Sequence, residues 1–399
     1  MAAPAARPDA MRRHNLALIL AQVHRDGTLT RAELTARLGL SRSTIGALVA
    51  DLVELGLVEE SVPSGGTRAG RPSHVVGPSR LGPYVVAVDV DVTHVTFAAV
   101  GLGGAVRARR AVALDNAPSP EQAAALIVDS IPALAREAGL AGRPVSIGVS
   151  VPGTVDRNTG TVGFAPNLAW RDAKFGSLLA DLAEPHVPVL VGNDADLAVL
   201  AEHIRGTARE HSDVVFLMGR IGVGAGIIVN GVPLRGIHGH AGEIGHNVVD
   251  PGGPECHCGK RGCLETFVGD HALLDLAGRS HAQTDQATEA VFAAAHLGDE
   301  HALRAVRAVA AALGQALGLL VNTLNPELIL LGGSFGEVLS IGREDIEAAL
   351  DRYVFNGPGE QVVLATPALG EDSALIGAAE IAFAQLIADP LGGRALAAR

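Results

Sequence analysis

The feature that most constrains the fold is the crowding of all three cysteines into eight residues, Cys256-His257-Cys258-Gly259-Lys260-Arg261-Gly262-Cys263. Three thiols at this density in a reducing compartment favour a shared metal over disulfides. Zinc prefers four tetrahedral sulfur and nitrogen ligands, so one ligand must come from elsewhere in the chain. We expect His246 to supply it, and the competing candidates are His257, His240 and His238. The alternatives are one disulfide with a free thiol, or three unconnected thiols.

A reducing compartment is itself an inference from the sequence. No stretch reaches the ~18 consecutive apolar residues that a membrane-spanning helix needs. Residues 1–13 lack the apolar core of a signal peptide. We therefore expect a cytoplasmic protein. Because a site with four protein ligands leaves no open position for water, we expect the zinc to be structural.

Residues 12–60 carry three helical patterns separated by glycines. Thr30 and Glu33 have the spacing of a capping box at the start of the second pattern. Ser41 offers an N-cap for the third, whose apolar residues between positions 45 and 53 recur at helical spacing. A helix, a short glycine-containing turn and a second helix predict a helix-turn-helix, whose second helix enters the major groove of DNA.

The polar face of the third helix supplies the candidate DNA contacts. Side chains in its first turn, off the apolar stripe, can reach base edges, and backbone N–H groups there can bind phosphate. A plain three-helix bundle with solvated polar residues is the alternative. These candidate contacts are Arg42, Ser43 and Thr44.

A β-wing is predicted directly after the three helices. Residues 57–61 and 73–76 have the pattern of two strands, and the basic loop between them is rich in glycine. The wing favours DNA binding over a plain bundle, although the same residues would also suit an ordinary linker. We expect two arginines of this loop to contact phosphates or the minor groove, namely Arg68 and Arg71.

The charge distribution supports DNA binding only slightly. Residues 1–80 hold ten Arg, no Lys and seven Asp or Glu, whereas the whole chain has a formal net charge of −12. A basic head on an acidic body suits a DNA-reading module attached to a soluble sensor. Acidic proteins are common, however, and the excess of basic residues in the head is small.

After residue 82 the pattern changes to two successive sets of strands and helices, which predicts an α/β protein. Two lobes with polar loops between them suggest a cleft in which a ligand binds. We expect a winged helix-turn-helix domain at 1–78, a first lobe at 79–206, and a second lobe at 207–399. The second lobe would contain the zinc loop, and its last helix would pack back on the first lobe.

Several motifs together resemble the ROK family of repressors, open reading frames and sugar kinases, over nearly the whole chain. The resemblance is to the winged-helix regulators of the family, of the xylose- or N-acetylglucosamine-repressor type. The most specific motifs are Gly242-Glu-Ile-Gly-His246 and the cysteine group followed by Leu264-Glu265. The supporting motifs are Gly148-Val-Ser-Val-Pro-Gly153, Ala165-Pro-Asn167, Asn193-Asp194, Asn325-Pro326 and Gly332-Gly333.

The resemblance implies a two-lobed, actin-like (ribonuclease H-like) sugar-kinase fold with a sugar bound between the lobes. Buried polar groups matched to each hydroxyl discriminate strongly against ligands that lack one. Taken alone, Asp194 would more often be a helix N-cap; the whole set of motifs favours ligand binding. The implied sugar contacts are Asn167, Asn193, Asp194, Glu243, His246 and Glu265. In the family's kinases the residue matching Asp194 is also the general base.

Both phosphate-binding loops of the family's kinases are altered here. The kinase pattern Asp-x-Gly-Gly-Thr is replaced by Asp89-Val-Asp91-Val92-Thr93, which loses both glycines and adds a carboxylate. The pattern Gly-Thr-Gly-x-Gly is replaced by Arg220-Ile221-Gly-Val-Gly224, although Arg220 would suit phosphate. Asp196 stands where family members often carry Asn. We therefore expect no ATP binding and no enzyme activity.

The sequence thus predicts a sugar-responsive transcriptional regulator, most simply a repressor of carbohydrate-metabolism genes. Its expected partners are operator DNA, a small sugar and further copies of itself in a homodimer or homotetramer. An ATP-dependent hexose kinase with an appended DNA-binding domain is the first alternative, supported by Asp194. A regulator controlled by a protein partner, with a vestigial pocket, is the second.

Overall fold

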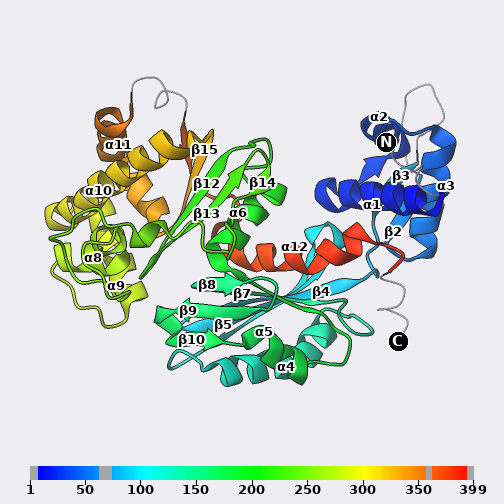
Figure 1. Ribbon diagram of the computed structural model, residues 1–399, viewed down its shortest axis with the longest axis horizontal. Coiled ribbons are helices and arrows are strands. Elements are labelled where there is room, and N and C mark those ends of the chain that lie inside the picture. Colours follow the sequence, from blue (N-terminus) through cyan, green and yellow to red (C-terminus); the bar gives the residue numbers. More distant parts are fainter. Residues whose placement is uncertain (1–7, 63–73, 356–361, 393–399) are drawn as a thin grey trace.

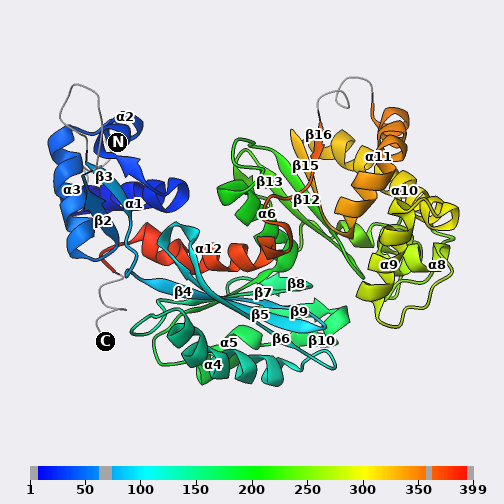
Figure 2. The ribbon, with the colours of Figure 1, turned by 180° about the vertical axis from the view of Figure 1, so that it is seen from behind.

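The computed structural model describes residues 8–62, 74–355 and 362–392. Within them the chain forms a small N-terminal head at one end and two larger α/β lobes (Figure 1). The last long helix, α12 (Ser373–Ala388), lies between the head and the sheet of the first lobe. The reverse view shows the same arrangement of head, helix and sheet (Figure 2).

The head folds as predicted because its helices carry local start signals. The Glu33 N–H donates to Thr30 Oγ1 at 3.1 Å and the Thr30 N–H donates to the Glu33 carboxylate at 2.7 Å, completing the capping box. The Ser41 hydroxyl accepts the Thr44 N–H at 3.1 Å and starts the next helix. The helices are α1 (Pro8–Asp26), α2 (Arg31–Leu38) and α3 (Arg42–Glu54).

The wing is a small antiparallel sheet in the order β1-β3-β2. Val58 pairs with Pro78 and Ser61 with Val75, so the return strand begins slightly later than its predicted start at Ser73. The strands are β1 (Leu29–Thr30), β2 (Val58–Ser61) and β3 (Val75–Pro78). The predicted wing contacts Arg68 and Arg71 lie outside the described residues.

The first lobe is built on a five-stranded sheet in the order β11-β7-β4-β5-β6. Helices α4 (Pro120–Glu137) and α5 (Phe175–Leu182) cover one face and α12 covers the other (Figures 1 and 2). A Cβ on Gly148 would lie 2.0 Å from the Ala378 carbonyl oxygen, so glycine is required where α12 meets the sheet. The strands are β4 (Tyr84–Val90), β5 (His94–Gly101), β6 (Val106–Ala113), β7 (Ile147–Val151) and β11 (Val189–Asn193).

A second, three-stranded sheet in the first lobe was not predicted. It consists of β8 (Thr154–Asp156), β9 (Thr161–Ala165) and β10 (Trp170–Ala173), in the order β10-β9-β8. Its strands are too short to give a clear alternation of apolar and polar residues. The 3-10 turn Pro166–Leu168 between β9 and β10 carries Asn167.

The second lobe has a five-stranded sheet in the order β14-β13-β12-β15-β16. Helix α6 (Asp194–Arg205) packs on β13 and β12, and α11 (Ser334–Tyr353) packs on β15. The strands are β12 (Val214–Gly219), β13 (Val223–Val229), β14 (Val232–Pro233), β15 (Leu328–Gly333) and β16 (Val363–Ala365). Its other helices are α7 (Glu265–Val268), α8 (Asp270–Leu276), α9 (Thr284–His296) and α10 (Glu300–Leu324).

Helix α10 is, among the described residues, the one helix long and apolar enough to span a membrane by length and composition. Its apolar face packs instead in the hydrophobic core of the second lobe, where Val309 and Leu317 are fully buried. The hydrophobicity of α10 is therefore that of a core helix.

One continuous hydrophobic core joins the head to the first lobe. It contains Leu20 and Val49 of the head, Phe383 of α12 and Ala98 of β5, all fully buried. The head is therefore packed against the lobe as well as being linked to it by the chain. A winged helix-turn-helix followed by two α/β lobes confirms the predicted fold class.

Candidate functional site

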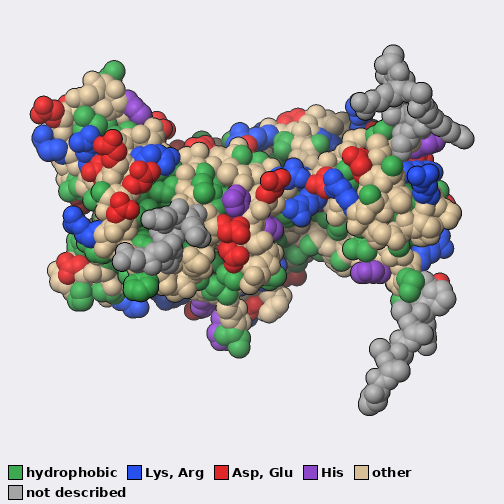
Figure 3. Space-filling view, turned by 90° about the horizontal axis from the view of Figure 1, so that it is seen from above, with side chains coloured by type: hydrophobic (Ala, Val, Ile, Leu, Met, Phe, Trp, Pro, Cys, Tyr) green, Lys and Arg blue, Asp and Glu red, His purple; other side chains and the backbone are tan. Residues whose placement is uncertain are grey.

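Helix α3 presents its polar first turn on the outside of the head. Arg42 and Ser43 are exposed and Thr44 is half-buried, while the apolar stripe of the helix faces the core. Seen from above, basic side chains lie on the end of the molecule that holds the head, and others are spread over the rest of this face (Figure 3). The first turn of the second helix of a helix-turn-helix is the part that enters a DNA groove in such proteins.

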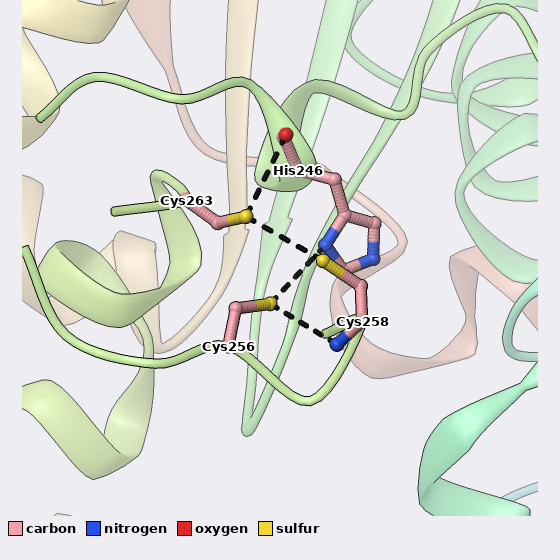
Figure 4. A group of neighbouring side chains, drawn as sticks. All are labelled: His246, Cys256, Cys258 and Cys263. Atoms are coloured by element: carbon pink, nitrogen blue, oxygen red, sulfur yellow. Dashed lines mark hydrogen bonds between the residues drawn. The ribbon is translucent and has the colours of Figure 1, made fainter. Parts of the chain in front are cut away.

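The structure brings His246 together with all three cysteines. The ligand atoms of these four residues lie within 4.8 Å of one another, with His246 Nδ1 3.6 Å from the Cys256 sulfur (Figure 4). The sulfurs of Cys258 and Cys263 are also 3.6 Å apart. Among the described residues, this group does not include the competing candidates His238, His240 and His257. Three sulfurs and one imidazole nitrogen form a donor set that suits a tetrahedral metal ion.

The loop around the metal-ligand group is wrapped tightly. A Cβ on Gly262, which has a φ of +71°, would lie 1.5 Å from the Asp250 carbonyl oxygen, so only glycine fits there. The Cys256 thiol donates to Glu265 Oε1 at 2.8 Å. Glu265 begins α7 and also lines the cleft between the lobes, so the metal-ligand group lies directly behind one wall of that cleft.

The cleft brings together all six residues expected to contact a sugar. They come from separate loops and element ends: a turn after β9, the junction of β11 and α6, the 3-10 turn Ile244–His246 with the residue before it, and the start of α7. Only the tertiary fold places them together. The six are Asn167, Asn193, Asp194, Glu243, His246 and Glu265.

Asn193 and Asp194 have different roles at the start of α6: the first caps the helix and the second faces the cleft. Asn193 is the N-cap: its amide oxygen accepts the Asp196 N–H at 3.0 Å and its amide nitrogen donates to the Gly153 carbonyl at 2.9 Å. Asp194 is therefore not the cap, and one of its oxygens accepts the Ala195 N–H at 2.8 Å. The other carboxylate oxygen remains available to a ligand in the cleft.

The cleft is strongly acidic. Burial raises the pKa of Asp194 to about 7, against a lowering by the hydrogen bond from the Ala195 N–H. Burial also raises the pKa of Asp196 to about 6, opposed by the positive charge of Arg235. Burial raises the pKa of Glu243 in the same way. Among the described residues that line the cleft, eight are Asp or Glu, whereas Arg220 is the one arginine.

The two altered phosphate-type loops meet across the cleft. Arg220, between β12 and β13, forms an ion pair with Asp91, between β4 and β5, and so links the second lobe to the first. The other Asp91 oxygen accepts the Val92 N–H at 2.5 Å. Sequence reasoning treated the two substitutions separately and missed this pairing, because the residues are 129 positions apart.

Comparisons with known proteins agree with this geometry. The ROK family profile matches residues 85–385, and that of the MarR family matches residues 17–69. The chain is 29% identical to a xylose repressor of Bacillus spizizenii, over 92% of this chain and 94% of the relative.

Solved structures of ROK family proteins are also similar to this chain. A ROK family transcriptional regulator, homologous to the E. coli MLC protein, superposes with a TM-score of 0.79 at 26% identity, over 98% of this chain and all of the other. A ROK family glucokinase from Streptomyces griseus superposes with a TM-score of 0.63 at 27% identity, covering 75% of this chain and 98% of the glucokinase. The family profile spans most of the chain, and the protein therefore belongs to the ROK family.

Proposed function

We propose that this protein is a sugar-responsive transcriptional repressor of carbohydrate-metabolism genes. The observation that carries the proposal is the packing of a winged helix-turn-helix head, through a shared core, onto the lobes that enclose a polar cleft. The full-length similarity to a xylose repressor supports it. Operator DNA would bind α3 and the wing, and the sugar would bind in the cleft, in the cytoplasm.

Sugar hydroxyls would be bound by Asn167, Asp194, Glu243 and Glu265 together with His246. A polyol needs several convergent acceptors and donors, and the cleft supplies both. His246 directs Nδ1 towards the cysteines, which leaves Nε2 as the ring nitrogen for a sugar hydroxyl. Asn193 would act mainly by fixing the start of α6, since both ends of its amide already have partners.

The metal-ligand group would hold zinc. With three cysteines and His246 occupied, all four tetrahedral positions are used, and the ion would supply no catalytic chemistry. Its role would be to fix the loop that presents Glu243, His246 and Glu265 to the cleft. Metal binding of this kind contributes directly to the folding of the loop.

Phosphoryl transfer is disfavoured by the Asp91–Arg220 ion pair. Kinase catalysis depends on groups that hold and neutralise the phosphates of the nucleotide. Here the one arginine of the lining is already paired with a carboxylate, and the other charges are carboxylates that repel ATP. We therefore propose that ATP does not bind and that Asp194 accepts a hydrogen bond from the ligand.

A hexose kinase is the second candidate, and the pKa of about 7 at Asp194 favours it, because a general base works best near the ambient pH. ATP consumption across a panel of sugars separates the two. Sugar-dependent ATP turnover at ordinary kinase rates would support the kinase, and turnover at the buffer background supports the repressor.

The function itself is tested by fluorescence anisotropy with DNA from upstream of the protein's own gene. Salt is held fixed, because phosphate contacts make DNA affinity steeply salt-dependent. Specific binding that one sugar of a panel shifts is the expected result. Absence of specific binding under every sugar would refute the DNA-binding role. The same preparation, examined by light scattering, distinguishes the expected homodimer from a homotetramer.

The substitution Arg42→Ala should lower operator affinity by about tenfold or more, since a base-edge or phosphate contact from a recognition helix contributes ~1–3 kcal/mol. Arg80→Ala is the matched control: this side chain is 90% exposed and lies beyond the end of β3 remote from the wing loop. Both variants remove one positive charge from the head. Equal losses in the two would mean that α3 makes no specific contact.

Sugar affinity should depend on pH through Asp194. A carboxylate accepts a hydroxyl hydrogen bond best when ionised, so affinity should be complete above a pKa of about 7 and fall as the pH drops below it. Between pH 8 and pH 6 the ionised fraction falls about tenfold, and calorimetric Kd should rise by a similar factor. Asp194→Asn should bind more weakly and without this dependence. A wild-type Kd that stays constant over this range would contradict the assigned role.

A further inference from the structure

A buried polar network joins the head to the lobes at the point where three helices meet. His24 of α1 is 3% exposed and Glu380 of α12 is 5% exposed, and the His24 Nε2 lies 2.9 Å from a Glu380 oxygen. Arg205, the last residue of α6, donates from Nε to the other Glu380 oxygen at 2.5 Å. It also donates to the backbone carbonyls of His24 and Gly103. Arg205 thus contacts the head through His24, the first lobe through Gly103, and α12 through Glu380.

The His24 ring is placed so that it cannot satisfy all its neighbours at once. The Gly103 N–H donates to Nδ1 at 3.1 Å, which requires Nε2 to carry the ring proton and to donate to Glu380. Arg205 Nη2, itself a donor, lies 2.7 Å from the same Nε2. Whether Arg205 lies closer to the His24 ring or to Glu380 therefore depends on the position of the end of α6 relative to α1. The His24 and Arg205 groups hold the pKa of Glu380 below its ordinary value against the effect of burial, so the carboxylate is charged.

The opposite end of α6 lies in the cleft. The helix begins at Asp194, a proposed ligand contact, and ends at Arg205, the centre of the network. It packs closely against α12: a Cβ on Gly377 of α12 would lie only 2.0 Å from the Leu197 carbonyl oxygen of α6. Glu202 of α6 also accepts the N–H groups of Ala368 and Leu369, just before Gly370 and Glu371 at the cleft wall.

We propose that Arg205 and Glu380 are positioning residues that transmit the state of the cleft to the DNA-binding head. Occupation of the cleft displaces α6 with α12, and the Arg205 guanidinium shifts between Glu380 and the His24 ring. The head then changes its position on the lobe. This inference rests on the proposed function and identifies the contact that couples its two sites.

The test is the coupling factor, the ratio of the DNA Kd measured with saturating sugar to that measured without. Coupling between two sites of one protein is commonly 5- to 150-fold. Glu380→Gln keeps the shape of the side chain and removes its charge. We expect its coupling factor to fall to within about twofold of one, while the Kd for sugar changes less than threefold. Arg205→Gln should give the same result, and if that variant fails to fold, Glu380→Gln decides.

Arg209→Gln is the matched control. Arg209 forms another ion pair with α1, with Asp26 at 2.6 Å, but its side chain is 41% exposed. Its coupling factor should equal that of the wild type. A Glu380→Gln variant that shifts both DNA Kd values by the same factor and keeps wild-type coupling would overturn the inference. A wild type with no coupling to any sugar would instead refute the proposed function.

Discussion

The substitution Cys263→Ser should abolish metal binding at the proposed zinc site and lower sugar affinity by about 100-fold or more. Cys263 is fully buried and, unlike Cys256, its sulfur makes no hydrogen bond to a proposed sugar-binding side chain, so the effect must pass through the loop. Without the ion, the loop that carries Glu243 and His246 loses its cross-link to the cysteine segment and keeps only its backbone hydrogen bonds and the packing of Ile244 and Val249 on the core. A 100-fold change corresponds to about 2.7 kcal/mol, a modest fraction of what structural zinc contributes in small zinc domains.

Metal content by atomic absorption and sugar Kd by calorimetry measure this effect together. His257→Ala is the control, because His257 stands between two of the cysteines but lies outside the group of four. It should keep both its metal and its affinity. If Cys263→Ser loses the metal and still binds sugar as the wild type does, the ion has no part in shaping the cleft. Operator binding without sugar should be nearly unchanged in both variants, since the head is remote from this loop.

The substitution Glu202→Ala should lower the free energy of unfolding by about 3–5 kcal/mol, because it leaves buried donors without an acceptor. Glu202 is fully buried, and its two oxygens accept four hydrogen bonds. The donors are the N–H groups of Thr207, Ala368 and Leu369 and the hydroxyl of Ser373. Glu202→Gln should lower the free energy of unfolding almost as much, since its amide nitrogen would face N–H donors.

Urea unfolding, followed by circular dichroism, measures this loss. Glu210→Ala provides the control: Glu210 lies beyond the end of α6 and is exposed, so its removal should change stability by less than about 0.5 kcal/mol. A loss below about 1 kcal/mol in Glu202→Ala would show that water replaces the carboxylate. Sugar affinity should fall in the same variant, because the released segment forms part of the cleft wall.

The head could be predicted from its sequence because its signals are local. The capping box at Thr30 and the N-cap at Ser41 each involve residues three positions apart, and the apolar stripes repeat within single helices. The main strands of both lobes were found for a similar reason, as apolar runs that are buried on both faces. The short strands β8 to β10 gave no such pattern, and the small helices α7 to α9 follow a loop whose shape depends on the cysteine group.

The residues of the candidate site likewise fall into those that the sequence predicts and those that it does not. Each proposed ligand contact was recognised from a motif of a few residues, and the structure places all six in one cleft. The pairing of Asp91 with Arg220, and the network around Glu380, join residues more than a hundred positions apart. No spacing rule describes such pairs. A charged residue in an altered phosphate-binding motif indicates only that phosphate binding is disfavoured. The side chain with which that residue pairs instead is visible only in the folded structure.

The position of α12 has a consequence for biosynthesis. The sheet face of the first lobe and the inner surface of α1 are both completed by this helix, yet it is among the last described segments to leave the ribosome. Until then the core that the head shares with the first lobe lacks Phe383, and the network around Arg205 lacks Glu380. Nascent and C-terminally truncated chains should therefore expose an apolar surface that chaperones bind, and any that reach DNA should ignore the sugar.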